Sequence, residues 1–126
     1  MRTRHRSASP YEERVGFSRA VRTGNRILVS GTAPIGPDGR TVPGDAYAQA
    51  RRCFRIAAEA IEALGGAARH VVRTRTYLVD AADADAAGRA HREAFGDAAP
   101  ASTMLVVKAL LDPAWRVEIE AEAELD

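Results

Sequence analysis

The chain has 126 residues, of which 46% are hydrophobic and 28% are charged, proportions that indicate a single globular domain and exclude a disordered chain. Its formal net charge is +1, so no overall field attracts it to nucleic acid or to an acidic membrane. The one cysteine, Cys53, excludes an internal disulfide and a multi-cysteine metal site. No apolar run approaches the roughly 20 residues that span a bilayer, and the basic first residues lack the apolar segment of a secretory signal. We therefore expect a cytoplasmic protein with no membrane partner.

The first third of the chain predicts a loose terminus, a β-hairpin and a long loop. Met1–Ser9 is polar and basic without periodicity, which predicts a loose tail. Val15–Val21 partly alternates and Arg26–Ser30 is rich in branched residues, so both are expected to be strands. The turn signal Thr23-Gly24-Asn25 joins them. Prolines and glycines fill Gly31–Gly44, which predicts an ordered loop.

Two amphipathic helices are predicted to cover one face of the sheet. The first helix follows Asp45, a residue type favoured at helix N-caps, and ends at Gly65-Gly66. Its apolar residues recur at the spacing of one helix face: Ala50, Cys53, Phe54, Ala57, Ile61 and Leu64. The segment Asp80–Gly96 is expected to form the second helix.

The strand with the clearest pattern is Val71–Val79, which alternates with a period of two. One face carries Arg73, Arg75 and Tyr77. Such a face is too polar for a core, so it must meet water, a ligand or another subunit. The opposite face is expected to consist of Val72, Thr74, Thr76 and Leu78.

The last two strands are predicted over Thr103–Leu110 and Arg116–Leu125. The resulting order is strand, strand, helix, strand, helix, strand, strand. It predicts an α+β fold, with a sheet backed by two helices, in one domain over residues 1–126.

Motifs for phosphate loops, dinucleotide binding and nucleophile elbows are absent from the sequence. The three histidines lack the spacing of a metal site, so neither a metal nor a cofactor is expected. Two features stand out. The final strand repeats glutamate at every second residue. Glu122 and Glu124 are interpreted as a solvated edge, whereas for Glu118 and Glu120 a solvated edge and a functional role both stay open. The proline-bounded turn at Ser102-Thr103 can present hydroxyls and backbone N–H groups to a small ligand.

Four segments resemble those of the RidA/YjgF family of small trimeric proteins. They are Gly16–Val21, Val29–Pro34, Arg73–Asp80 and Val117–Ala121, the last of which matches the family's closing V-E-I-E-A. The resemblance extends from Ser9 to Leu125. It implies a chorismate-mutase-like α+β fold and a homotrimer with three clefts between subunits.

The resemblance also implies a chemistry. The best-known members hydrolyse reactive 2-imino or 2-enamino acids to a 2-keto acid and ammonia, without a cofactor. An arginine in a P-x-R-[ST] motif binds the substrate carboxylate, and a glutamate in the V-E-I-E strand positions the attacking water. By this resemblance Glu118 is the water-positioning glutamate, and Ser30 and Gly31 line the cleft. Phe17 stands where the family often has tyrosine, so the ring remains without its hydroxyl.

The departure from the family lies at the carboxylate-binding arginine, which Ser102 replaces. A neutral serine cannot provide the charged, two-pronged contact of a guanidinium. Arg89 on the second helix is a candidate substitute, and its alternative is an ordinary solvated arginine. These residues predict an arginine-lacking subgroup with weak activity toward 2-imino acids.

The sequence therefore favours a homotrimer that binds a small carbonyl- or imine-type metabolite. If the protein is an enzyme, we expect hydrolysis by water held at Glu118, with oxyanion donors at Ser102 or Thr103. Partial burial should raise the pKa of Glu118. The alternative is a non-catalytic binding or regulatory protein on the same scaffold. A nucleic-acid partner is disfavoured, because no basic patch interleaved with aromatic residues is present.

Overall fold

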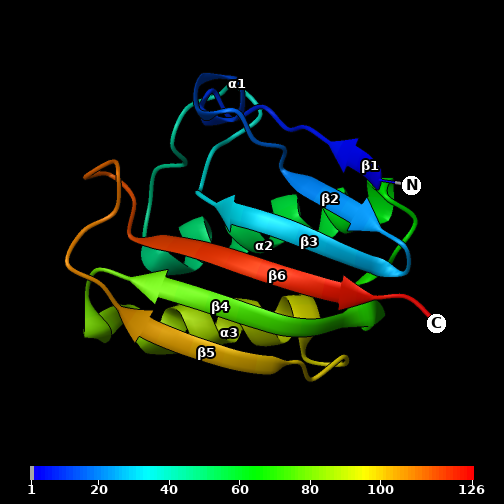
Figure 1. The fold of residues 1–126 in the computed structure, drawn as a ribbon. Coiled ribbons are helices and arrows are strands. Elements are labelled where there is room, and N and C mark those ends of the chain that lie inside the picture. Colours follow the sequence, from blue (N-terminus) through cyan, green and yellow to red (C-terminus); the bar gives the residue numbers. More distant parts are fainter. Residues whose placement is uncertain (1) are drawn as a thin grey trace.

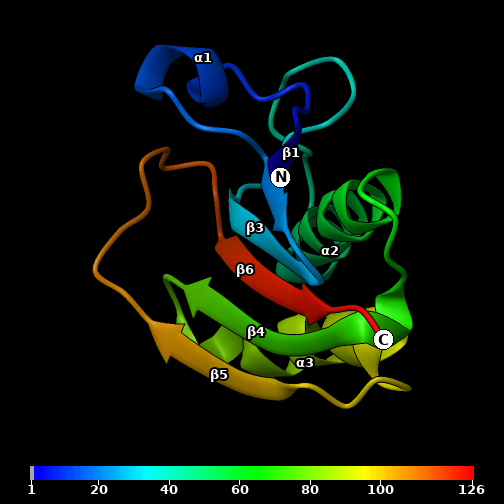
Figure 2. The same ribbon diagram turned by 45° about the vertical axis from the view of Figure 1, so that its right-hand side comes forward.

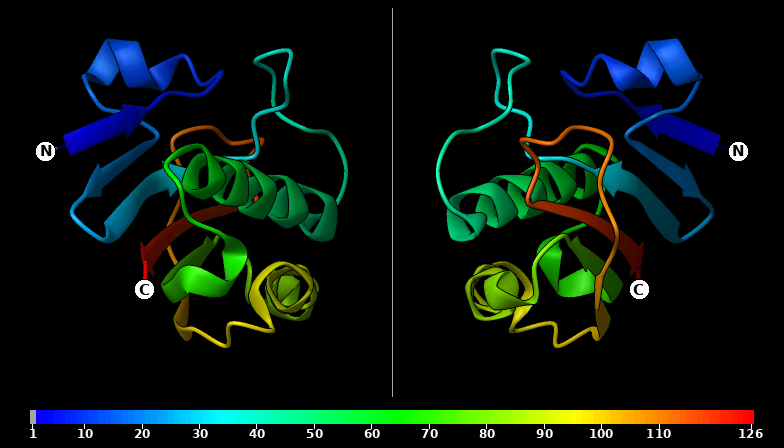
Figure 3. Two further views of the ribbon diagram at one scale, coloured as in Figure 1. Left: turned by 90° about the vertical axis from the view of Figure 1, so that its right-hand side faces the viewer. Right: turned by 90° about the vertical axis from the view of Figure 1, so that its left-hand side faces the viewer.

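The computed structural model describes residues 2–126, and its main element is a six-stranded sheet. The strands are β1 (Arg2–His5), β2 (Ala20–Thr23), β3 (Arg26–Thr32), β4 (Val71–Leu78), β5 (Ala101–Val106) and β6 (Val117–Glu124), and the α-helices are α1 (Tyr11–Val15), α2 (Ala46–Ala63) and α3 (Ala84–Phe95). Helices α2 and α3 lie behind the sheet in Figure 1, and Figure 3 shows them on the same side of it. The predicted α+β fold, with two helices backing a sheet, is confirmed.

The strand order is β1-β2-β3-β6-β4-β5. All neighbouring strands are antiparallel except β4 and β5, which are parallel. Helix α3 provides the crossover that a parallel pair requires. Strand β6, the last element of the chain, lies between β3 and β4 (Figure 2). Its residues therefore lie in the middle of the sheet, with a partner strand on each side.

The residues predicted to begin and to end the first long helix have the expected geometry. The Asp45 side chain accepts a hydrogen bond from the backbone N–H of Ala48 at 2.9 Å, and so caps α2. Gly65 follows the helix with a φ of 95°, the left-handed conformation that glycine adopts without strain. No helix among residues 2–126 is long and apolar enough to cross a membrane.

The core lies between the sheet and the two long helices. Its largest fully buried members include Ile27, Phe54, Ile61, Leu78, Phe95 and Ile119. In β6, Val117, Ile119, Ala121 and Ala123 face the helices, as their alternation predicts. Close packing of this layer fixes the direction of every second residue in β6, because a strand alternates its side chains between two faces.

The N-terminal segment differs from its prediction. Residues Arg2–His5 are not a loose tail: they form β1, which pairs antiparallel with β2. The backbone hydrogen bonds of a sheet edge order this segment although its side chains show no pattern. The predicted strand Val15–Val21 is also wrong in its first part. Helix α1 occupies Tyr11–Val15 and ends at Gly16, whose φ is 92°.

Two strands have boundaries that the sequence did not predict. The register between β4 and β6 shifts between Val71 and Arg73, so Val71 is buried and Val72 is exposed. The expected inward direction of Val72 is therefore wrong. Strand β5 begins at Ala101 and ends at Val106, not at Leu110, because its partner β4 ends at Leu78.

Candidate functional site

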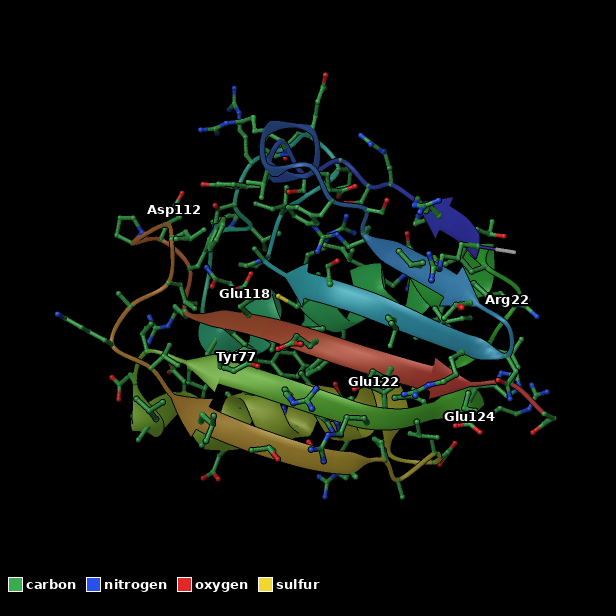
Figure 4. All side chains as sticks on the ribbon, viewed as in Figure 1. Arg22, Tyr77, Asp112, Glu118, Glu122 and Glu124 are labelled. Carbon is green, nitrogen blue, oxygen red and sulfur yellow. The ribbon has the colours of Figure 1, made fainter. Side chains whose placement is uncertain are left out.

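The face of the sheet opposite α2 and α3, which we call the open face, carries the polar half of β4 and β6. Its side chains include Arg73, Arg75, Tyr77, Glu118, Glu120, Glu122 and Glu124. In Figure 4 Tyr77, Glu118, Glu122 and Glu124 lie on the face that no helix covers. The Tyr77 hydroxyl donates to Glu120, and Arg26 and Arg75 form ion pairs with Glu122 at 2.8 and 3.3 Å.

Glu118 differs from Glu120 and Glu122 because its half-buried carboxylate is unpaired. Among the described residues, no side-chain hydrogen bond or ion pair reaches it. It lies at the start of β6, on the wall of a pocket of about 150 Å³ that we call the Glu118 pocket. The residues that matter for its chemistry are Tyr11, Phe17, Arg19, Gly31, Trp115 and Glu118.

Burial raises the pKa of Glu118 above the ordinary value of a glutamate. The nearby positive charge of Arg19 opposes this effect, and the negative charge of Glu120 adds to it. A carboxylate with a raised pKa is a better proton acceptor near neutrality. The structure therefore agrees with the prediction from the sequence that partial burial raises the pKa of Glu118.

Gly31 lies directly beside this carboxylate. A Cβ at position 31 would lie 3.3 Å from Oε2 of Glu118, a tighter contact than side chains normally make. The glycine thus leaves room for Glu118. Its neighbour Ser30 does not line the Glu118 pocket of this chain: the Ser30 hydroxyl donates to the carbonyl of Ser18 at 2.7 Å, and so holds β3 to the segment before β2.

Arg19 is the site residue that the sequence reasoning missed. Its side chain is 3% exposed, and its Nε lies 3.3 Å from Oε2 of Glu12, which is equally buried. Nη1 donates to the carbonyl of Gly31 and to Oγ1 of Thr32. No local pattern marks this pair, because Glu12 lies on α1, a helix that the sequence did not predict.

Ser102 does not join Glu118 within one chain. Its Oγ accepts a hydrogen bond from Oγ1 of Thr74 at 2.8 Å, and that same Thr74 oxygen lies 2.7 Å from Nε2 of His91 on α3. Ser102 therefore points to the helix side of the sheet, away from the open face. Thr103, the next residue of β5, pairs with Arg75 and shares the open face with Glu118, with β4 between their strands.

Arg89 also lies apart from the pocket. Its guanidinium carbon lies 4.0 Å above the ring centroid of Tyr47, so it stacks on a residue of α2. Both residues belong to the helix layer, and the sheet separates them from Glu118. Of the seven predicted site residues, the Glu118 pocket thus brings together Phe17, Gly31 and Glu118.

The described residues contain no cluster of three or more histidine, cysteine, aspartate or glutamate side chains suited to a metal ion. The thiol of Cys53 is fully buried in the core, and burial raises its pKa. The fold and this site together define a small α+β protein with a carboxylate-bearing pocket at the end of a central strand.

Comparison with known proteins places this class of protein in a family. The family model described as Endoribonuclease L-PSP matches residues 8–125. Rv2704 of Mycobacterium tuberculosis, a member of the YjgF/YER057c/UK114 family, has a crystal structure with a TM-score of 0.89 and 38% identity, covering 99% of this chain and 100% of that one. The chain therefore belongs to the Endoribonuclease L-PSP family, the RidA/YjgF family that the four segments predicted.

Two curated relatives agree with this assignment. The uncharacterized protein SCO2049 of Streptomyces coelicolor is 42% identical over 120 residues, which are 95% of this chain and 90% of that protein. The RutC family protein PYRAB12510 of Pyrococcus abyssi is 33% identical over 95 residues, 75% of each.

Proposed function

We propose that this chain binds a small imine- or carbonyl-bearing metabolite in the Glu118 pocket and hydrolyses the imine, with Glu118 positioning the attacking water. One observation carries the proposal: a half-buried carboxylate with no protein partner lines a pocket and has a raised pKa. On the same strand Glu120 and Glu122 are paired, and Glu124 is exposed to water. The unpaired carboxylate of Glu118 is free to accept a hydrogen bond from water.

The proposed reaction follows from these atoms. A water held by Glu118 attacks the carbon of the protonated imine, C=NH₂⁺, and transfers a proton to the carboxylate, which forms a neutral carbinolamine. Glu118 then returns this proton to the nitrogen. The C–N bond breaks as the hydroxyl group becomes a carbonyl and passes its proton to the departing ammonia, so a carbonyl compound and an ammonium ion leave. A carboxyl group whose pKa lies closer to neutrality performs both transfers better than an ordinary glutamate.

A homotrimer is part of this proposal. The open face carries Leu28 and Leu105, which are 41% and 51% exposed, at either side of the charged centre formed by β4 and β6. Packing copies of the chain through this face would cover both leucines and remove the polar centre from bulk water. Thr103 also lies on the open face, so the Thr103 hydroxyl of a neighbouring copy is our candidate oxyanion donor. Ser102 is not, because it faces α3.

The test is Glu118→Gln, which keeps size and shape and removes the ionisable group. Glu124→Gln is the matched control, because Glu124 is an exposed glutamate on the same face of the same strand. Imines generated in situ provide the substrate panel. Hydrolysis should fall by roughly a hundredfold in Glu118→Gln and stay unchanged in the control. Equal rates in Glu118→Gln and the parent would refute the catalytic role.

The second candidate function is non-catalytic binding of the same class of molecule. It is favoured by the arrangement at Ser102, where the family's arginine is absent and the serine is used in a contact with Thr74. In that case no imine is turned over, and Glu118→Gln changes only affinity. The family's description names an endoribonuclease. We do not propose action on RNA, because the arginines of the open face alternate with glutamates and leave no basic patch.

A further inference from the structure

The walls of the Glu118 pocket are mainly apolar. Three aromatic side chains, Tyr11, Phe17 and Trp115, line it together with Val15 and Leu111. Tyr11 and Trp115 meet edge to face, with ring centroids 5.6 Å apart and planes at 69°. The indole N–H of Trp115 donates to Thr41 Oγ1 at 3.0 Å. That polar group is therefore already bonded, and the half-buried rings of Tyr11 and Phe17 keep surface for a ligand.

The charges of the pocket do not balance. Arg19 is the one cationic side chain that lines it, and Glu12 compensates that charge at 3.3 Å, with both groups almost fully buried. Glu118 has no such partner among residues 2–126: it feels the charge of Arg19, which Glu12 already pairs, and the opposing charge of Glu120. Arg14 lies over the ring of Tyr11 but is exposed, so water and salt screen it. The pocket therefore has an excess of negative charge.

We propose that the Glu118 pocket selects a small cationic nitrogen compound, an iminium or a primary ammonium, with an apolar body and no carboxylate group. This inference rests on the proposed function of the same pocket. A positive nitrogen gains from the unpaired carboxylate and from the faces of aromatic rings. A substrate carboxylate would lie beside Glu118, with no unpaired buried cation to receive it.

The size of the pocket limits the apolar body. A cavity near 150 Å³ accommodates benzene, and this pocket has about that volume. The substrate class is then R–CH=NH₂⁺, where R is an aliphatic group or a single ring. Its hydrolysis is R–CH=NH₂⁺ + H₂O → R–CHO + NH₄⁺. The class of reaction that supplies such an iminium is the two-electron oxidation of a primary amine.

The test compares three ligands of nearly equal size and different charge: benzylammonium, benzyl alcohol and benzoate. Calorimetric titration of the full chain should show benzylammonium binding at least about tenfold more tightly than benzyl alcohol, because an ion pair in a partly buried site contributes on the order of 1.4 kcal/mol or more. Benzoate should not bind. In Glu118→Gln the preference for benzylammonium over benzyl alcohol should disappear, and in Glu124→Gln it should persist.

The inference is overturned if benzoate binds as tightly as benzylammonium, or if the preference for the cation survives in Glu118→Gln. A second variant, Phe17→Leu, removes a ring and leaves every charge in place, and it should weaken benzylammonium binding more than benzyl alcohol binding. Selective binding of benzylammonium without hydrolysis of any imine supports the charge selection and contradicts the proposed reaction. Rapid hydrolysis of 2-imino acids supports the reaction and contradicts the charge selection.

Discussion

The two faces of the sheet use their polar side chains in different ways. On the helix side, Thr74, Ser102 and His91 contact one another and are fixed by those contacts. On the open face Glu120 and Glu122 are paired, whereas the half-buried Glu118 has no side-chain partner among residues 2–126. A paired group has its hydrogen-bond partners within the fold. Burying half of an unpaired carboxylate costs free energy, which a hydrogen bond from a ligand or from water has to offset. The contrast is our reason for proposing that the functional site lies on the open face.

The largest expected effect concerns what covers the open face in solution. If copies of the chain associate through it, a charge placed there should prevent assembly, since burying an unpaired charge costs several kcal/mol. We expect the parent to sediment as a trimer and Leu105→Glu as a monomer. Arg92→Glu, on the exposed side of α3, reverses a charge outside this face and should leave the trimer intact. A parent that sediments as a monomer at micromolar concentration would contradict the proposed assembly.

The next effect concerns Ser102, which by the sequence resemblance stands where the family has its carboxylate-binding arginine. Losing a charged hydrogen bond to a buried carboxylate costs about 1.5–3 kcal/mol, so turnover of 2-imino acids should be about tenfold to a hundredfold below that of an arginine-bearing relative. Ser102→Arg should not restore it. The new side chain would face α3 and displace the contact with Thr74, which lowers the free energy of unfolding. Restored turnover in Ser102→Arg, measured with 2-iminopropionate, would show that position 102 can reach the pocket.

The smallest expected effect is a pH dependence of stability from the helix side. Burial lowers the pKa of His91 below its ordinary value of 6.5. The unfolded chain therefore takes up this proton first as the pH falls. The stability contributed by neutral His91 is fully present above about pH 6.5 and is lost progressively below it.

The variant His91→Gln keeps a hydrogen-bond donor near Thr74 and cannot titrate. Its free energy of unfolding, measured by urea denaturation at several pH values, should fall less steeply below about pH 6.5 than that of the parent. If the free energy of unfolding fell equally steeply below about pH 6.5 in His91→Gln and in the parent, His91 would not be the group whose titration changes the stability.

The parts of the fold that follow a periodic pattern could be predicted from the sequence. Helix α2 and strand β6 each bury one face, so their apolar residues repeat with a regular period. The direction of Val72 could not be predicted, because the register shift before Arg73 depends on the partner strand. Strand β1 was missed for a related reason: its order comes from backbone bonds to β2, which leave no mark on its side chains.

The candidate site was predicted in part for the same physical reasons. Glu118 lies on a regular strand, so its alternation with buried neighbours placed it on the polar face. The pair formed by Arg19 and Glu12 depends on a short helix and a contact between segments, and neither has a local pattern. The inward direction of Ser102 depends on β5 pairing parallel with β4, which a single sequence does not reveal.

The central place of β6 has a consequence for how the protein is made. Strand β6 is the one connection between two parts of the sheet, β1-β2-β3 on one side and β4-β5 on the other. It is also the last of these strands to be synthesised. Until β6 pairs with them, β3 and β4 each lack a partner on the side that β6 occupies in the finished sheet, and an unpaired edge can bind another strand. The strand that brings Glu118 to the pocket therefore also closes both edges.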